Sequence, residues 1–273
     1  MLSILQNHQM RKFKKIGSRL LIVYLLITAM LYFFQEKIIF LPTKLPQDYS
    51  YSFSEPFEEF YLTAADGAKL NGLHFKRAKP KGVILYFHGN AGDLARWGEI
   101  AIFFTKKEYD VIVMDYRTYG KSIGKLSEDA LFKDAQLFYN FTLGNYKEAD
   151  IIVYGRSLGA AIATHTASKN KPAKLILETP FYNLHEIAKK RFPILPLKWL
   201  LKYKFESNQY ITDVSCPITI FHGTEDKVVP YKSGRKLFNL ASGKKEFITV
   251  DGGGHNDLIN FKAYTTTIDR VLN

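Results

Sequence analysis

The chain is poor in the residues that build disulfides and metal sites. It has a single cysteine, Cys216, in 273 residues, so no disulfide can form within it. No paired cysteine and histidine pattern surrounds Cys216, and we expect a small buried apolar residue beside Pro217 rather than a nucleophile. No H-E-x-x-H motif occurs, and His185-Glu186 has no second histidine at helical spacing. We therefore expect neither a metal nor a cofactor.

A concentrated basic surface of the kind that binds nucleic acid is also lacking. The net charge is +12, but the basic residues after residue 20 are spread along the sequence. They form no long basic run and no nucleic-acid-binding motif. We therefore expect no nucleic-acid partner, and the sequence leaves the oligomeric state open. Five of the positive charges lie together near the N-terminus: Arg11, Lys12, Lys14, Lys15 and Arg19.

Long hydrophobic runs are scarce, with one exception. Residues 20–34 read LLIVYLLITAMLYFF without a charge. Extended back to Ile16, the run covers about 28 Å of helix, close to the ~30 Å hydrocarbon core of a bilayer. We expect a transmembrane anchor over residues 16–34. A cleaved signal peptide is the alternative, but the run ends in Tyr-Phe-Phe rather than in the small residues that the peptidase selects.

The charges that flank this run predict its orientation. The basic tail, residues 1–15, and Arg19 carry five positive charges, whereas Lys37 and Lys44 are the nearest that follow. The positive-inside rule therefore places the N-terminus in the cytoplasm and the rest of the chain on the periplasmic, extracellular or luminal side. Pro42 and Pro46 predict an extended connector over residues 35–58 that would lift the following domain off the membrane.

Residues 59–273 alternate between two patterns. Short, apolar, β-branched runs predict strands buried on both faces, and segments of helical length separate them. This alternation predicts one α/β domain with a mostly parallel sheet flanked by helices. One stretch, residues 181–213, separates two strands by more than thirty residues, and we expect it to form a small lid. The predicted strands are 60–75 as a hairpin, 82–87, 111–114, 151–154, 174–177, 218–221 and 246–250; the predicted helices are 94–107, 128–143, 158–169, 231–240 and 257–271.

One serine lies in a tight turn between a predicted strand and a predicted helix. In GRSLG, Ser157 is flanked by glycines, as a strand-to-helix turn that exposes a nucleophile requires. The backbone N–H groups at the start of the helix favour a developing oxyanion. We expect the N–H of Leu158 to supply one donor. The N–H of Asn90, in the glycine-bearing loop after an earlier strand, would supply the second.

A serine hydroxyl needs a base, and the base needs an orienting acid. His255 lies in a glycine-rich loop after the last predicted strand, and Asp226 lies in the turn after the strand before it. We expect His255 to be the base for Ser157 and Asp226 to be the acid that orients His255. Three other acids remain as alternatives to Asp226: Glu225, Asp251 and Asp257. His88 and His222 each precede a glycine at a strand end, where we expect them to shape the loop.

Five blocks of the sequence, taken in order, resemble the α/β-hydrolase superfamily and, more narrowly, its membrane-anchored α/β-hydrolase-domain serine hydrolases. The blocks are FHGNAGD, MDYRTYGKS, YGRSLGAA, FHGTEDKVVP and GGGHND, and QEKIIFLP after the hydrophobic run fits as well. The resemblance covers about residues 35–270. It implies an α/β-hydrolase fold in which Ser157 is the nucleophile, Asp226 the acid and His255 the base.

Together these features predict a membrane-anchored serine hydrolase that works through an acyl-enzyme. The anchor, with the aromatic and basic segment 181–213, favours membrane-associated acyl substrates, with carboxylic esters ranked before thioesters and peptides last. No acidic pocket for a substrate amine is visible in the sequence. Two alternatives stay open: a serine peptidase-like hydrolase, and a catalytically silent, membrane-tethered binding protein.

Overall fold

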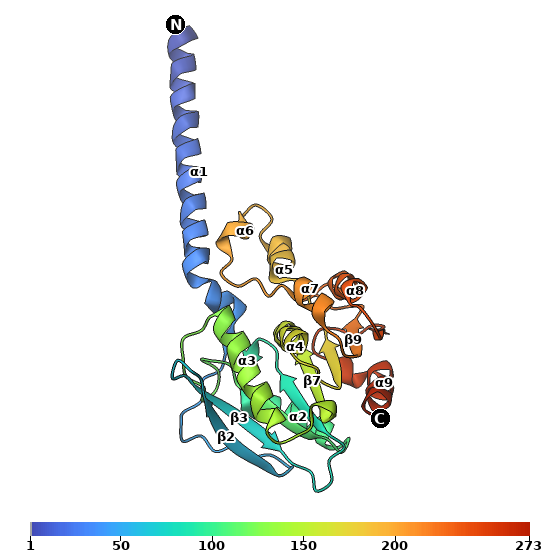
Figure 1. Ribbon diagram of the computed structural model, residues 1–273. Helices are drawn as coiled ribbons and strands as arrows, with labels where there is room; N and C mark the ends of the chain where they lie inside the picture. The colour runs from blue at the N-terminus through green and yellow to red at the C-terminus, as the bar shows by residue number, and fades with distance from the viewer. Residues whose placement is uncertain (1) are drawn as a thin grey trace.

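The computed structural model describes residues 2–273, with the side chains of His8 and of residues 10–273. An eight-stranded sheet forms the centre of the domain, in the order β10-β9-β8-β7-β4-β6-β3-β2 (Figure 1). The strands from β10 to β6 are mutually parallel, whereas β3 runs antiparallel to β6, and β2 antiparallel to β3. The strands are β2 (Phe57–Thr63), β3 (Lys69–Phe75), β4 (Val83–Phe87), β6 (Asp110–Met114), β7 (Ile151–Arg156), β8 (Lys174–Glu178), β9 (Ile218–Gly223) and β10 (Lys245–Val250).

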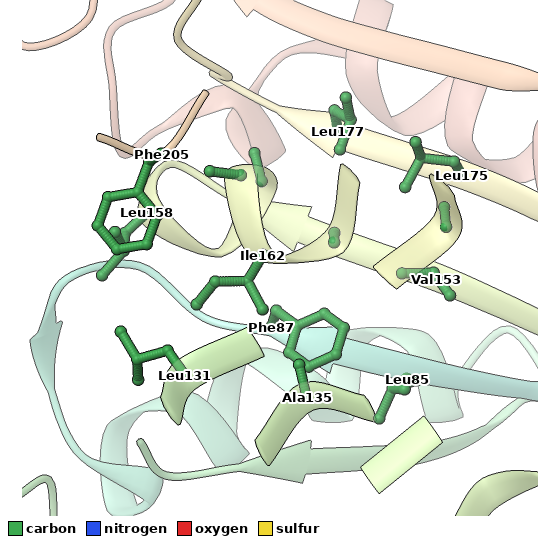
Figure 2. Close-up of a cluster of buried hydrophobic side chains, with 14 of the residues drawn as sticks. Leu85, Phe87, Leu131, Ala135, Val153, Leu158, Ile162, Leu175, Leu177 and Phe205 are labelled. Atoms are coloured by element: carbon green, nitrogen blue, oxygen red, sulfur yellow. The ribbon is translucent and has the colours of Figure 1, made fainter. Parts of the chain in front are cut away.

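Helices cover both faces of this sheet. In β4 the side chains alternate, with Leu85 and Phe87 in the core on one face and Ile84 and Tyr86 on the other. This double burial explains why the central strands are continuous apolar runs in the sequence. Figure 2 shows the first face, where Leu131 and other helix residues pack on the strands. That face is covered by α3 (Glu128–Leu143), α4 (Leu158–Lys169) and α8 (Tyr231–Leu240), and the other by α2 (Leu94–Thr105) and α9 (Lys262–Leu272). The 3₁₀ turns Glu148–Asp150 and Leu258–Asn260 precede β7 and α9 in the sequence.

A long N-terminal helix, α1 (Leu2–Ile39), projects from the domain (Figure 1). Its 38 residues span about 57 Å. Within it, Met10–Ile39 is long and apolar enough to cross a membrane, and its apolar side chains, such as Leu20 and Phe33, are exposed. An exposed apolar surface of this size is unfavourable in water, which makes the helix a candidate membrane span.

The helix continues past the end of the predicted span, which corrects the expected connector. Residues 35–39, predicted to be extended, form the last turn of α1, and β1 (Leu41–Pro42) then pairs in parallel with β5 (Ala91–Gly92). No proline or glycine occurs between residues 35 and 41, and the side chains of Gln35 and Glu36 in this last turn bond to residues 200–203. The α/β domain is therefore held directly against the end of the helix rather than lifted away on a free linker.

Residues 181–213, the predicted lid, follow β8 and precede β9 in the sequence, and they lie on the side of the domain where α1 departs (Figure 1). The base of this segment is packed into the core through Tyr203 and Phe205, whereas Ile194 and Trp199 are exposed. The segment contains α5 (Leu184–Arg191), α6 (Leu197–Leu200), α7 (Ser207–Tyr210) and the 3₁₀ turn Ile211–Asp213.

Candidate active site

Ser157 occupies the sharp turn between β7 and α4. Its φ is 53° and its ψ is −113°, a backbone conformation that is strained for a residue with a side chain. The glycines on either side leave room for this turn. A Cβ on Gly155 would lie 2.3 Å from the carbonyl oxygen of Gly159, and a Cβ on Gly159 would lie 2.0 Å from that of Phe87. The turn therefore requires both glycines and directs the serine hydroxyl out of the sheet.

Loops after three parallel strands bring a serine, a histidine and an aspartate together. The Oγ of Ser157, after β7, lies 2.9 Å from Nε2 of His255, after β10. Nδ1 of the same histidine lies 2.7 Å from Oδ2 of Asp226, which follows β9. These distances fit the tautomer in which the serine hydroxyl donates to Nε2 and the Nδ1–H donates to the carboxylate. The three side chains predicted as a unit are thus in one hydrogen-bonded chain.

The carboxylate of Asp226 is held in its charged form. Burial by itself would raise the pKa of Asp226, but hydrogen bonds from His222 and His255 outweigh this and keep the pKa well below its usual range. Its Oδ1 also accepts the backbone N–H groups of Val228 and Val229, at 2.9 and 2.8 Å. A carboxylate fixed in this way can orient an imidazole and stabilise its protonated form.

The acids and histidines considered as alternatives have other surroundings. Glu225 and Asp251 are exposed, and Asp257 accepts the backbone N–H of Gly254 at 2.7 Å. His222 is fully buried, with Nε2 3.0 Å from the carbonyl oxygen of Val229. The structure therefore places His222 behind Asp226, in a loop-shaping position.

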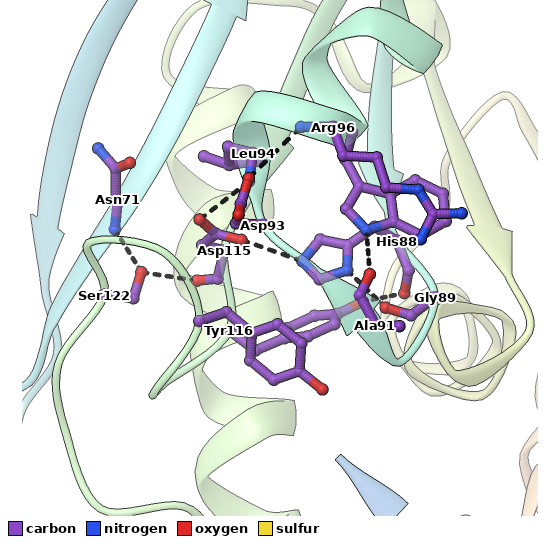
Figure 3. Close-up of polar contacts among 12 residues, drawn as sticks. Asn71, His88, Gly89, Ala91, Asp93, Leu94, Arg96, Asp115, Tyr116 and Ser122 are labelled. Atoms are coloured by element: carbon purple, nitrogen blue, oxygen red, sulfur yellow. Dashed lines mark hydrogen bonds and ion pairs between the residues drawn. The ribbon is translucent and has the colours of Figure 1, made fainter. Parts of the chain in front are cut away.

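The loop after β4 is held rigidly beneath the serine. His88 is fully buried, with Nδ1 2.6 Å from the carbonyl oxygen of Gly89 and Nε2 3.4 Å from Asp115 (Figure 3). The Tyr116 hydroxyl donates to the carbonyl oxygen of His88 at 2.7 Å. These contacts fix the chain that carries Asn90, and Asn90 and Leu158 both line the cavity that contains Ser157.

Arg156, which the sequence reasoning missed, ties the histidine loop to the serine turn. Its buried guanidinium donates to the carbonyl oxygen of His255 at 3.3 Å and to Oδ1 of Asn256 at 3.1 Å. The same group pairs with Glu178 at 3.3 Å, and Glu178 accepts the hydroxyl of Tyr154 at 2.6 Å. The available signal was the position of Arg156 beside Ser157 in GRSLG.

A cavity of about 500 Å³ lies above the serine, a size typical of small-molecule sites. Most of its wall is apolar and comes from α1, from residues 181–213 and from the turn that carries Val228. Three cations line it: Lys190, Arg191 and Lys227. None of the described residues that line the cavity is an aspartate or a glutamate.

A mostly parallel sheet with helices on both faces, and a serine on a tight turn at its carboxyl edge, define an α/β hydrolase. The chain belongs to the family described as "Serine aminopeptidase, S33" (Hydrolase_4), whose sequence model matches residues 78–214. It is thus an esterase- and lipase-like member of the α/β-hydrolase superfamily, as its motifs predicted.

Relatives and solved structures agree with this assignment. An uncharacterized protein of Mycobacterium tuberculosis is 31% identical over 244 residues, which cover 87% of each chain. A lysophosphatidylserine lipase of Danio rerio is 29% identical over 245 residues, covering 76% of this chain and 63% of the lipase. The fold is similar to that of a Pyrococcus furiosus esterase, with a TM-score of 0.67, 21% identity and coverage of 84% of this chain and 98% of the esterase.

Proposed function

We propose that the protein is a membrane-anchored serine hydrolase that cleaves carboxylic esters, or thioesters, of lipid-like acyl substrates. The observation that carries this proposal is the hydrogen-bonded chain from Ser157 through His255 to Asp226 at the floor of a largely apolar cavity. A serine in this chain is activated by the base, and an apolar cavity is suited to an acyl group.

The proposed reaction has two halves. In the first, Ser157 Oγ attacks the acyl carbonyl while His255 takes its proton and Asp226 stabilises the imidazolium; the N–H groups of Asn90 and Leu158 bind the oxyanion. The imidazolium then gives its proton to the leaving alcohol or thiol, and the acyl-enzyme forms. In the second half, His255 deprotonates a water that attacks the acyl-enzyme, and the acid leaves as the serine recovers its proton.

The charge of the cavity favours esters over aminopeptidase substrates, although the family description names the latter. A peptide with a free amino terminus carries an ammonium group, which needs an acidic partner when it leaves water. The described lining residues supply cations instead, at Lys190, Arg191 and Lys227. The lysophosphatidylserine lipase among the relatives supports the same ranking, because its name describes a lipid substrate.

An activity-based probe tests the serine mechanism. A fluorophosphonate is expected to label the wild-type protein at Ser157 and to leave the Ser157→Ala variant unlabelled. A panel of p-nitrophenyl esters from short to long chain, assayed with and without detergent micelles, then ranks the substrates. A wild-type protein that resists the probe, under conditions that label a control hydrolase, would support a silent binding protein; cleavage of aminoacyl amides alone would support a peptidase.

We further propose that residues 16–34 span the membrane, with the basic tail in the cytoplasm and residues 59–273 as the catalytic domain on the opposite side. The charge asymmetry about α1 supports this orientation. Protease added to intact cells or spheroplasts is expected to digest the catalytic domain and to spare the first nineteen residues. Protection of the domain until the membrane is permeabilised reverses the orientation, and a soluble fragment that starts near residue 35 identifies a cleaved signal.

A further inference from the structure

The end of the anchor helix forms a wall of the cavity that contains Ser157. Four residues of α1 line it: Leu31, Gln35, Ile38 and Ile39. Their spacing of three and four residues places them on one face of the helix. Residues of α5 and α6 form the facing wall, among them Leu184, Ile187, Leu197 and Leu200. A helix that served only as a tether would have no reason to present an apolar face to this cavity.

Hydrogen bonds hold this wall in place. Gln35 is buried, and its Nε2 donates to the carbonyl oxygen of Leu200 at 3.2 Å while its Oε1 accepts the N–H of Lys202 at 2.8 Å. The hydroxyl of Tyr203 donates to Glu36 at 2.9 Å. Both α1 residues therefore bond to the segment 181–213, which fixes the helix beside it.

The helix end is also bonded to the loop beneath the serine. The side-chain amide of Asn90 donates to the carbonyl oxygen of Ile39 at 3.0 Å, and the N–H of Leu41 donates to the carbonyl oxygen of Asn90 at 2.9 Å. The residue proposed to bind the oxyanion therefore touches the end of α1. These bonds place the anchor within the site itself.

The outer part of the segment 181–213 lies beside the middle of the proposed membrane-spanning residues. The hydroxyl of Tyr24 lies 3.4 Å from the carbonyl oxygen of Ile194. Tyr24 is in the middle of residues 16–34, about 16 Å along the helix from Gln35. Ile194 and Trp199 are 83% and 82% exposed at this tip. In a membrane, these two apolar side chains would be covered by lipid.

Cations surround this apolar tip, as is typical of surfaces that contact anionic lipids. Lys190 and Arg191 also line the cavity that contains Ser157. The cations that flank Ile194 and Trp199 in the sequence are Lys189, Lys190, Arg191 and Lys198, and Lys189 donates to the carbonyl oxygen of Pro193 at 2.6 Å. A leaflet of anionic lipids is the partner that matches both the exposed apolar side chains and the charges.

We propose that α1 is part of the substrate site: a single acyl tail passes from the leaflet between α1 and residues 181–213, and lies against Leu31 and Ile38 while its ester reaches Ser157. The proposal rests on the serine hydrolase function above. This route keeps the tail in apolar surroundings throughout, so the substrate enters without exposing its methylene groups to water. It also makes the α1 face a determinant of acyl-chain length.

Cross-linking tests the position of the tail directly. The full-length protein, in vesicles of phosphatidylcholine with phosphatidylglycerol, is treated with a dodecyl fluorophosphonate that carries a diazirine at the end of its chain. We expect phosphonylation of Ser157 and, after photolysis, cross-links within residues 31–39. Labelled Ser157 with cross-links only outside α1 overturns the inference and leaves the serine hydrolase intact. Failure to label Ser157 overturns the proposed function and the inference with it.

A matched pair of variants tests the effect on specificity. Leu31→Trp fills the α1 face of the cavity, whereas Leu26→Trp makes the same change at a residue that is 64% exposed and does not line it. We expect Leu31→Trp to lower the ratio of kcat/KM for dodecanoyl over butanoyl ester about tenfold or more, and Leu26→Trp to leave the ratio unchanged. An equal fall in both variants, or in neither, contradicts the inference. The cross-link needs no substitution, so it decides the matter if Leu31→Trp fails to fold.

Discussion

The cavity has two walls that are built in different ways. Ser157 and Leu158 lie in a turn whose shape is set by its own glycines and by the buried strands behind it. The opposite wall joins α1 to residues 181–213, and the contact between Gln35 and Leu200 links positions 165 residues apart. The comparison teaches that the turn that carries Ser157 is shaped by its local sequence, whereas the opposite wall depends on the docking of distant elements.

The two walls also differ in what surrounds them. Behind the serine lies close-packed interior, in which a displaced atom meets others at once. Behind α1 lies an exposed apolar surface, and the end of the helix is held by a few hydrogen bonds and by the packing of Ile39 against the core. Substitutions in the serine wall should therefore affect turnover steeply, and substitutions in the α1 wall should affect it mildly while changing selectivity or mobility.

The largest expected effect follows from removing the hydroxyl of Ser157, the proposed nucleophile. Ser157→Ala is expected to lower kcat for a short p-nitrophenyl ester by on the order of 10⁴ or more, because the proposed covalent step is lost. The melting temperature should stay near that of the wild type, since alanine still has a Cβ and fits the turn. Ester turnover that survives in purified Ser157→Ala protein would contradict the proposed role of the serine.

The next effect concerns the orienting acid. Asp226→Asn is expected to lower kcat by about 10³ to 10⁴, because an amide cannot stabilise the imidazolium and can favour the wrong tautomer. The depressed pKa of Asp226 means that the wild-type carboxylate is charged throughout the neutral range. Glu225→Gln is the control, since this neighbour is exposed. A large loss from Glu225→Gln with little from Asp226→Asn would assign the acid to Glu225.

A smaller effect is expected at Arg156. Arg156→Met removes the hydrogen bonds to the histidine loop and is expected to lower kcat by about 10- to 100-fold, because small misplacements of a catalytic group reduce the rate steeply. It also leaves Glu178 without its cation, which should destabilise the fold by about 3 kcal/mol. The double variant Arg156→Met/Glu178→Gln separates the two effects. We expect its melting temperature to recover while kcat stays low; a kcat that recovers together with the melting temperature would restrict Arg156 to stability.

Much of the fold could be predicted because burial on both faces leaves a clear sequence pattern. The run at 151–154 predicted β7, and its apolar residues are all buried. The hairpin predicted over residues 60–75 likewise corresponds to the antiparallel pair β2 and β3. The loops after β7, β9 and β10 could be predicted to meet because parallel strands present their carboxyl ends at one edge.

The rest of the architecture could not be predicted because it depends on contacts between distant segments. Residues 35–39 remain helical in part because Gln35 and Glu36 bond to residues 200–203. The sequence around residues 35–39 contains no pattern that identifies these distant partners. The pairing of β1 with β5 spans two residues on each side, too few for a pattern. The role of Arg156 depends on the backbone of His255, 99 positions away.

The smallest effect on turnover is expected from loosening the α1 wall. Gln35→Ala leaves the carbonyl oxygen of Leu200 and the N–H of Lys202 without this partner, which costs about 1–3 kcal/mol in groups shielded from water. The lost hydrogen bonds would make the local opening of residues 181–213 easier without affecting the serine turn. Trypsin should therefore cut this basic segment about fivefold faster or more, while kcat for a short ester should change less than about threefold. Gln136→Ala is the matched control, because Gln136 bonds to Asn170 outside the cavity. Equal rates of cleavage in the two variants would show that the hydrogen bonds of Gln35 do not hold residues 181–213 against α1. The α1 wall would then be fixed by packing, as the serine wall is.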